Sequence, residues 1–390
     1  MLVSPLRAFS VALLTIIVAA LVASPRTALS YEIGPWPYEK VHQDLTRMAR
    51  DCLSRAQEAR PSSCVSSPSA VRDYTVVENG ALDFKELELG KVSAEELAEA
   101  VRWPDDPSRE VDFWTIYKFG VKMKGQCAKH YTGGLRDGLL CSSHYGPLQY
   151  WHAMASSCGE STVETQDKML AWAEFLYEVA VREDLDQPYC KYWQEQPKED
   201  KGKLAAVLAP KDDFPCIKDG LPWMLGTLFT FKCTNPRSSE TCDELDSRDA
   251  RLSALGALLH MVQDSYAQGH AARGSCEMYV KNWRPLSKIE CLPISQFYTY
   301  DKQAGWKHGE ADGIPQIGDS CLKGSPEVDD PVLASATVLW FVQQQKGATA
   351  LTDYLKKRVF LLAQRHEPLA GTGDCFAEQL MQIDKCRVTE

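Results

Sequence analysis

The sequence lacks the short motifs that mark several large enzyme classes. It has no glycine-rich phosphate loop, no G-x-S-x-G nucleophile elbow, no internal repeat and no long block of alternating apolar and polar residues. The first two absences argue against a P-loop nucleotide hydrolase and a serine hydrolase of the α/β type. The other two argue against a repeat solenoid and a fold built mainly from strands. The periodicity that remains is helical, so we expect an all-α fold with long loops.

The chain is also short of positive charge. Its formal net charge is −10 at pH 7 over 390 residues. This argues against a protein that binds double-stranded DNA through a broad basic surface. Phosphodiester substrates are not excluded, because bound metal ions can supply positive charge locally.

Cysteine is plentiful but never in the spacing of a metal motif. The chain has 14 cysteines, spread from Cys52 to Cys386, and none forms a Cys-x-x-Cys pair. We therefore expect up to seven disulfides, one for every two cysteines, in an oxidising compartment. A metal in this protein would be held by His and by Asp or Glu.

Residues 1–30 have the composition of a secretory signal peptide. Arg7 precedes an apolar run from Phe9 to Ala23, and small residues follow up to Ser30. Cleavage there would leave Tyr31 first and make the protein secreted or periplasmic. The alternative, an uncleaved membrane anchor, is disfavoured because the apolar run is short for a bilayer span.

Apolar residues at helical spacing are separated by irregular, cysteine-rich segments. We expect helices from His42 to Leu53 and over residues 93–103, 165–182, 251–264 and 331–362, with irregular chain over 107–160 and 274–330. The second helix opens with a capping-box pattern, Ser93-x-x-Glu96, and stops at Pro104. We expect a single domain over residues 31–390, with 184–245 as an insertion.

The segment from Arg251 to His270 is the most informative part of the chain. Its leucines form the apolar stripe of a helix, and His260 and Asp264 fall together on the opposite side, one turn apart. A buried carboxylate is costly unless it is paired or bound to a metal. The two side chains could satisfy each other, but His270 extends the pattern to His-x3-Asp-x5-His, which is typical of ligands for neighbouring metals.

Other histidines and aspartates are candidate metal ligands because of their positions in the sequence. His42 begins a helix, Asp105 follows the Pro104 break, and His308 and Asp312 have one-face spacing if their segment is helical. His144 precedes a Gly-Pro turn, which is usual for a loop residue, and His130 and His152 are alternatives to it.

In this order the candidates resemble the zinc-dependent phospholipase C and single-strand nuclease superfamily, in which a mainly helical domain holds three zinc ions in a cleft. The resemblance rests on five short motifs: Leu259-His260-x3-Asp264-x5-His270, His308-x3-Asp312, Trp103-Pro104-Asp105, Ser143-His144-Tyr145 and His42 followed by a helix. The chain departs from the family in having Gln268 where a proline is usual before the last histidine of the central motif.

The resemblance implies a set of zinc ligands. Asp105, His144, His260 and Asp264 would hold one ion, His270, His308 and Asp312 a second, and His42 with the bridging Asp264 a third. The third ion would also take the amino group of the mature N-terminal residue, which is Tyr31 here, or Trp36 after a further cleavage. Because the gap from Asp105 to His144 is longer than usual, His130 or His152 could replace His144.

The implied function is a secreted phospholipase C that hydrolyses phosphatidylcholine-type lipids with a zinc-activated water and no protein nucleophile. Asp105 could both bind metal and orient or deprotonate the attacking water. The phrase from His260 to Tyr266 looks more like bacterial phospholipases than nucleases. Aromatic-rich segments at 113–119, 150–151 and 223–231 could rest on a lipid surface or pack in the core. The alternatives are a single-strand nuclease or 3′-nucleotidase, and a non-catalytic secreted binding protein with zinc as a structural staple.

Overall fold

Helices dominate the computed structural model of this protein. It describes residues 41–56, 59–64, 82–84, 90–105, 138–157, 160–182, 185, 187–196, 198, 216–218, 221–222, 224–229, 247–267, 269–273, 288–289, 292–299, 316–317 and 327–363. The helices with at least one full α-helical turn are α2 (Val41–Ala56), α3 (Ala94–Ala100), α6 (Gly138–Tyr145), α7 (Thr162–Val181), α8 (Tyr189–Glu195), α10 (Ser247–Asp264), α13 (Pro331–Gln343) and α14 (Ala348–Tyr354). The mainly helical class is therefore confirmed for this part of the chain.

Among the residues just given, short strands form four two-stranded pairs. β1 (Leu82–Phe84) with β2 (Gly90–Val92), β3 (Ile217–Lys218) with β4 (Leu221–Pro222), and β5 (Ala271–Arg273) with β7 (Ile294–Phe297) are antiparallel, and β6 (Lys288–Ile289) with β8 (Gln316–Ile317) is parallel. The β5–β7 pair bears on the site, because the backbone N–H of Tyr298 donates to the carbonyl of His270 at 2.9 Å.

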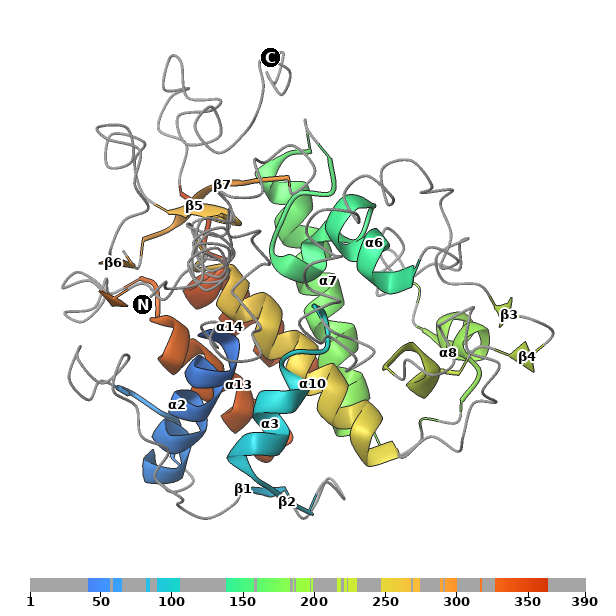
Figure 1. Cartoon of the computed structure of the whole chain (residues 1–390), viewed down its shortest axis with the longest axis horizontal. Coiled ribbons are helices and arrows are strands. Elements are labelled where there is room, and N and C mark those ends of the chain that lie inside the picture. Colours follow the sequence, from blue (N-terminus) through green and yellow to red (C-terminus); the bar gives the residue numbers. More distant parts are fainter. Residues whose placement is uncertain are drawn as a thin grey trace, which may run out of the picture.

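Helix α10 runs through the middle of the helices, with α7 on one side and α2 and α3 on the other (Figure 1). Every residue from Ala250 to Ala267 is buried, as expected for a helix with neighbours on all sides. A Cβ on Gly256 would lie 2.0 Å from the carbonyl oxygen of Ala100, so only glycine allows α3 to approach α10 this closely.

Local sequence explains where two helices begin. Ser93 accepts a hydrogen bond from the backbone N–H of Glu96, and the Glu96 carboxylate accepts one from Ser93, which confirms the predicted capping box. Ser161 and Glu164 form the same arrangement at the start of α7, three residues before the predicted helix.

The prediction of one long helix over residues 331–362 is wrong. α13 ends near Gln344, Gln345 adopts a left-handed conformation with φ of 46°, and α14 begins after Gly347 and continues into a π-helical turn, Leu355–Val359. The N–H of Lys346 donates to the carbonyl of Phe341, and that of Gln345 to Val342, the Schellman arrangement that closes a helix.

The prediction of irregular chain over residues 107–160 is wrong for two described segments. Residues 138–145 form α6, and Gln149–His152 form a 3-10 helix, η5. Residues 106–137 lie outside the described part.

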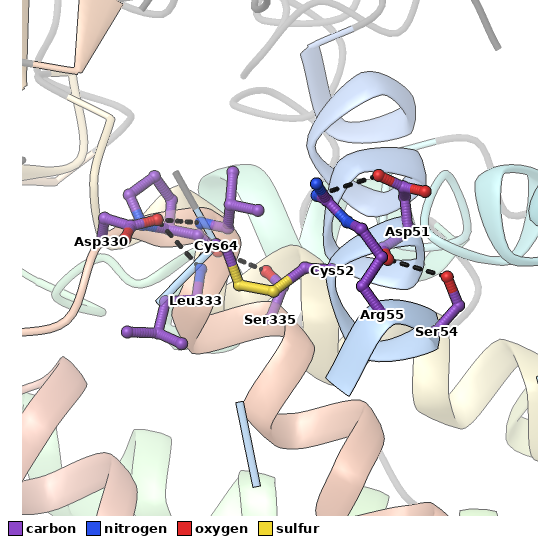
Figure 2. Close-up of a disulfide and its surroundings, with 10 residues drawn as sticks. Asp51, Cys52, Ser54, Arg55, Cys64, Asp330, Leu333 and Ser335 are labelled. Carbon is purple, nitrogen blue, oxygen red and sulfur yellow. Dashed lines mark hydrogen bonds and ion pairs between the residues drawn. A yellow bond between two sulfur atoms is a disulfide. The ribbon is translucent and has the colours of Figure 1, made fainter. Parts of the chain in front are cut away.

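Two disulfides are described. Cys52–Cys64 ties α2 to the segment after it, and Cys190–Cys216 ties α8 to the residue before β3. Figure 2 shows Cys52 and Cys64 beside the start of α13, where the Asp330 carboxylate accepts from the N–H of Leu333 at 2.9 Å. Disulfides persist in oxidising compartments, which is compatible with a secreted protein.

Several aromatic residues of the segments predicted to contact lipid or pack in the core belong to the core. Tyr150 and Trp151 are 2% and 1% exposed, and Trp151 stacks on Trp172 with ring centroids 4.5 Å apart. Phe229, in the 3-10 helix η6 (Gly226–Phe229), is also buried and lies 5.1 Å from the Trp103 ring. Tyr150, Trp151 and Phe229 therefore stabilise the fold and do not face a lipid surface. None of the described helices combines the length and the hydrophobicity needed to cross a bilayer.

Candidate metal centre

Seven acidic and imidazole side chains from separate parts of the chain meet in the core. They are His42 from α2, Asp105 from the turn after α3, His144 from the end of α6, His152 from η5, His260 and Asp264 from α10, and His270 from the turn before β5. None of them is more than 3% exposed. A buried cluster of five histidines and two carboxylates is unusual, because protein cores consist mainly of apolar side chains.

Asp264 lies at the centre of this group. Its Oδ1 is 3.2 Å from His42 Nε2, and its Oδ2 is 3.0 Å from His260 Nε2 and 3.1 Å from His152 Nδ1. His270 Nδ1 lies 3.6 Å from the same Oδ2. Histidines from four segments therefore converge on one carboxylate whose two oxygens face different partners.

Asp105 approaches the group from the opposite side. Neither of its buried oxygens accepts a hydrogen bond from a described residue. The imidazole nitrogens nearest to the Asp105 carboxylate are His144 Nε2 at 3.4 Å, His260 Nε2 at 3.6 Å and His152 Nδ1 at 3.7 Å. A buried carboxylate without hydrogen-bond donors is strongly destabilising unless a cation compensates its charge.

Backbone carbonyls determine which nitrogen of two histidines holds the proton. His260 Nδ1 lies 2.9 Å from the carbonyl oxygen of Val101, and His270 Nδ1 contacts that of His152. A carbonyl can only accept, so in each neutral ring Nδ1 carries the hydrogen and Nε2 the lone pair. The lone pair of His260 therefore faces carboxylate oxygens of Asp264 and Asp105, an arrangement that attracts a cation.

The charges of the group follow from its burial. Burial holds the pKa of His42 below its usual value and lowers that of His152 to about 3. Burial acts the same way on His260, but the carboxylates of Asp264 and Asp105 outweigh it and raise the pKa of that ring. Burial would raise the pKa of Asp264, and the surrounding histidines instead hold it well below its ordinary value. The lowered pKa values of Asp105 and Asp264 favour their anionic forms, and those of His42 and His152 favour neutral rings, the protonation states that metal ligands require.

The residues present fit a metal ion. Three trios offer ligand atoms within 4.8 Å of one another: His42, Asp105 and His260; Asp105, His144 and His152; and His152, His260 and Asp264. Imidazole nitrogens and carboxylate oxygens suit zinc and other divalent transition metals. The trios overlap at Asp105, His152 and His260, so they form one continuous group that could hold a metal ion.

The structure brings together six of the eight ligands predicted from the sequence: His42, Asp105, His144, His260, Asp264 and His270. The predicted ligands His308 and Asp312, the alternative His130, and the N-terminal candidates Tyr31 and Trp36 lie outside the described residues.

His152 was only an alternative to His144 in the sequence, yet both lie in the group. Their ring centroids are 4.4 Å apart, and His152 is the one that also contacts α10. Those contacts, with His260 Nε2 and Asp264 Oδ2, are both 3.1 Å, and no pattern near residue 152 in the sequence reports them.

No protein-family model, curated protein or solved structure matches this chain. The fold and the site define a class: a mainly helical, disulfide-bonded protein with a buried histidine–aspartate centre that could hold a metal ion.

Proposed function

We propose that this protein is a secreted zinc-dependent phosphodiester hydrolase of the phospholipase C and single-strand nuclease type. One observation carries the proposal: buried imidazoles, two of them oriented by backbone carbonyls, converge on the two buried carboxylates of Asp105 and Asp264. The order of these residues along the chain supports it, because it follows the motifs of that superfamily.

The distances support a ligand role for each of these residues. Asp264 would bridge two ions, since its Oδ1 faces His42 and its Oδ2 faces His152 and His260. Asp105 would complete the site that His260 and His152 share. The second ion of the superfamily pattern would take His270 with His308 and Asp312.

Zinc held by such ligands lowers the pKa of a bound water to about 7 and polarises a phosphoryl oxygen. The protein's own contribution is to fix the ligands and to handle a proton. Asp105 is suited to the second task, because its oxygens accept no hydrogen bond from described residues and one of them could receive the proton of the attacking water. No serine or cysteine nucleophile is needed.

We propose phosphatidylcholine-type lipids as the substrate. The support is the phrase from His260 to Tyr266 alone, because Tyr150, Trp151 and Phe229 are core residues. Single-stranded nucleic acid is the competing substrate, and it would need an aromatic slot for a base beside the metal.

The complete burial of the seven side chains favours a second candidate function, a structural metal staple in a non-catalytic binding protein. Structural zinc sites are closed, whereas catalytic ones keep an open position for water. A hydrolase and a structural metal site would both contain zinc, but only the hydrolase would turn over substrate. Metal content and turnover must therefore both be measured.

The experiment is to load the purified protein with zinc, determine the metal content, and offer a chromogenic phosphocholine ester and single-stranded DNA in parallel. Turnover of the ester supports the lipid enzyme, and turnover of DNA supports the nuclease. Bound zinc without either activity supports the staple and contradicts both enzymes.

Variants extend the experiment to the site. His260→Ala and Asp264→Ala should lose zinc and activity together, whereas Asp105→Asn should lose more activity than zinc. Asp330→Asn is the matched control, because Asp330 is a buried carboxylate that caps α13 and accepts hydrogen bonds from the backbone N–H groups of Val332 and Leu333. Retention of full zinc content and rate in His260→Ala or Asp264→Ala would contradict the site.

A further inference from the structure

Gln263 is a fully buried amide that precedes Asp264 on α10 and reaches toward two other helices. Its Oε1 lies 2.7 Å from His42 Nδ1 on α2. Its Nε2 lies 2.9 Å from Thr46 Oγ1, also on α2, and 3.4 Å from Ser335 Oγ on α13. All three partners are buried.

The hydrogen bonds of Ser335 fix which way this amide points. The Ser335 hydroxyl donates to the carbonyl of Pro331 at 2.7 Å, so toward Gln263 it can only accept. The amide nitrogen must therefore face Ser335, and the amide oxygen must face His42.

An amide oxygen facing His42 fixes the proton on that ring. Nδ1 must donate to Gln263, so the neutral ring carries its lone pair on Nε2, which lies 3.2 Å from Asp264 Oδ1. The ring also stacks on His260 at a centroid distance of 3.8 Å and an interplanar angle of 25°. His42 is therefore held in position by its neighbours and in one tautomer by Gln263.

We propose that Gln263 is a positioning residue that selects the ligating nitrogen of His42 and thereby builds the His42–Asp264 part of the metal centre; this rests on the metal centre proposed above. Backbone carbonyls orient His260 and His270, whereas a side chain orients His42, so this orientation can be removed by substitution. A neutral amide orients the ring without adding a third negative charge to Asp105 and Asp264. It also links the centre to α13 through Ser335.

The test compares Gln263→Met, which removes the acceptor, with Gln263→Glu, which retains an acceptor for His42. Gln166→Met is the matched control, because Gln166 is a buried glutamine on α7 whose amide donates to the Phe360 carbonyl at 2.6 Å. The first readout is the ¹⁵N chemical shifts of the His42 ring in the metal-free protein, which report the tautomer and which a merely structural role would not move. The second is zinc affinity by competition with a chelator.

In Gln263→Met we expect the His42 ring to lose its uniform Nδ1–H form, and the zinc that depends on His42 to bind about 10- to 100-fold more weakly, the usual effect of removing such a partner. Gln263→Glu should restore the tautomer and most of the affinity, and Gln166→Met should change neither. If Gln263→Met does not fold, Thr46→Val combined with Ser335→Ala releases the amide without altering Gln263, and the same loss of the uniform tautomer is expected.

An unchanged His42 tautomer together with wild-type zinc affinity in Gln263→Met, or in the double variant, would overturn the role of Gln263. Failure of the wild-type protein to bind zinc would instead overturn the metal centre. The tautomer readout needs no metal, so the two failures are distinguishable.

Discussion

His152 and His144 lie in the same centre but contact it differently. His152 Nδ1 is 3.1 Å from both His260 Nε2 and Asp264 Oδ2, whereas the contact of His144 with a carboxylate is the longer one to Asp105, at 3.4 Å. We therefore predict that His152→Ala weakens zinc binding more than His144→Ala does. Zinc content after gel filtration, with affinity by chelator competition, measures the difference. An equal or larger loss in His144→Ala would show that the shorter distances of His152 do not reflect ligation.

The buried, neutral state of His152 predicts how stability depends on pH in the metal-free protein. Burial lowers the pKa of His152 from 6.5 to about 3, so below about 6.5 the unfolded chain takes up a proton that the folded chain does not. The free energy of unfolding should therefore fall as the pH drops from 6.5 towards 3.

Urea unfolding of chelator-treated protein at pH 7, 5.5 and 4.5, about the span over which an unperturbed histidine titrates, measures this effect. His152→Asn cannot take up the proton, so its stability should change less over the same interval. Parallel pH profiles for the two proteins would rule out His152 as the cause. His260 does not produce this slope, because its raised pKa contributes stability at low pH that is lost as the pH rises.

At the scale of elements, the close contact between α3 and α10 holds two parts of the site in place. Gly256 allows α3 to approach, and the turn after α3 supplies both the Val101 carbonyl that orients His260 and the Asp105 carboxylate. Gly256→Ala should destabilise the protein by about 1–3 kcal/mol or more, because the new methyl group meets backbone that cannot yield cheaply. It should also weaken zinc binding. Gly347→Ala is the control, because a Cβ there meets nothing within 4 Å; equal effects of the two substitutions would contradict the argument.

The end of α13 at Gln345 allows a substitution that should stabilise the protein. A left-handed conformation is unfavourable for residues other than glycine, and Gln345 has φ of 46°. Gln345→Gly should therefore raise the free energy of unfolding by about 1 kcal/mol. Gln344→Gly should lower it, because Gln344 has an ordinary φ of −91°. Thermal denaturation of both variants decides between relief of this conformation and a general effect of glycine.

Elements marked by strong local patterns could be predicted from the sequence. The leucine stripe located α10, and the Ser93–Glu96 pattern located the start of α3. The break at Gln345 escaped prediction because it depends on backbone hydrogen bonds in a helix ending that glycine usually marks. The sequence named His152 only as an alternative to His144, because its partner His260 is 108 residues away and no local pattern reports such a contact.

For the molecule as a whole, the centre joins segments that are distant in sequence. His42 and Gln263, which meet at its edge, are 221 residues apart, and the other members come from α6, η5 and the turn before β5. An ion bound by these side chains would connect α2, α10 and the turn after α3, three segments that the two described disulfides do not connect to one another.

Removal of metal should therefore destabilise the whole fold and not only the site. Ligand that binds the native state alone stabilises it by about 2.7 kcal/mol at a free concentration of 100 times Kd. We expect zinc to raise the denaturation temperature by several degrees, increasingly with concentration, and chelation to reverse the change. Asp264→Asn, which alters the carboxylate that faces four histidines, should abolish most of the zinc-dependent shift. Asp330→Asn should leave that shift unchanged, because asparagine caps a helix about as well as aspartate does. A zinc-dependent shift of wild-type size in Asp264→Asn would mean that the stabilising ion binds elsewhere.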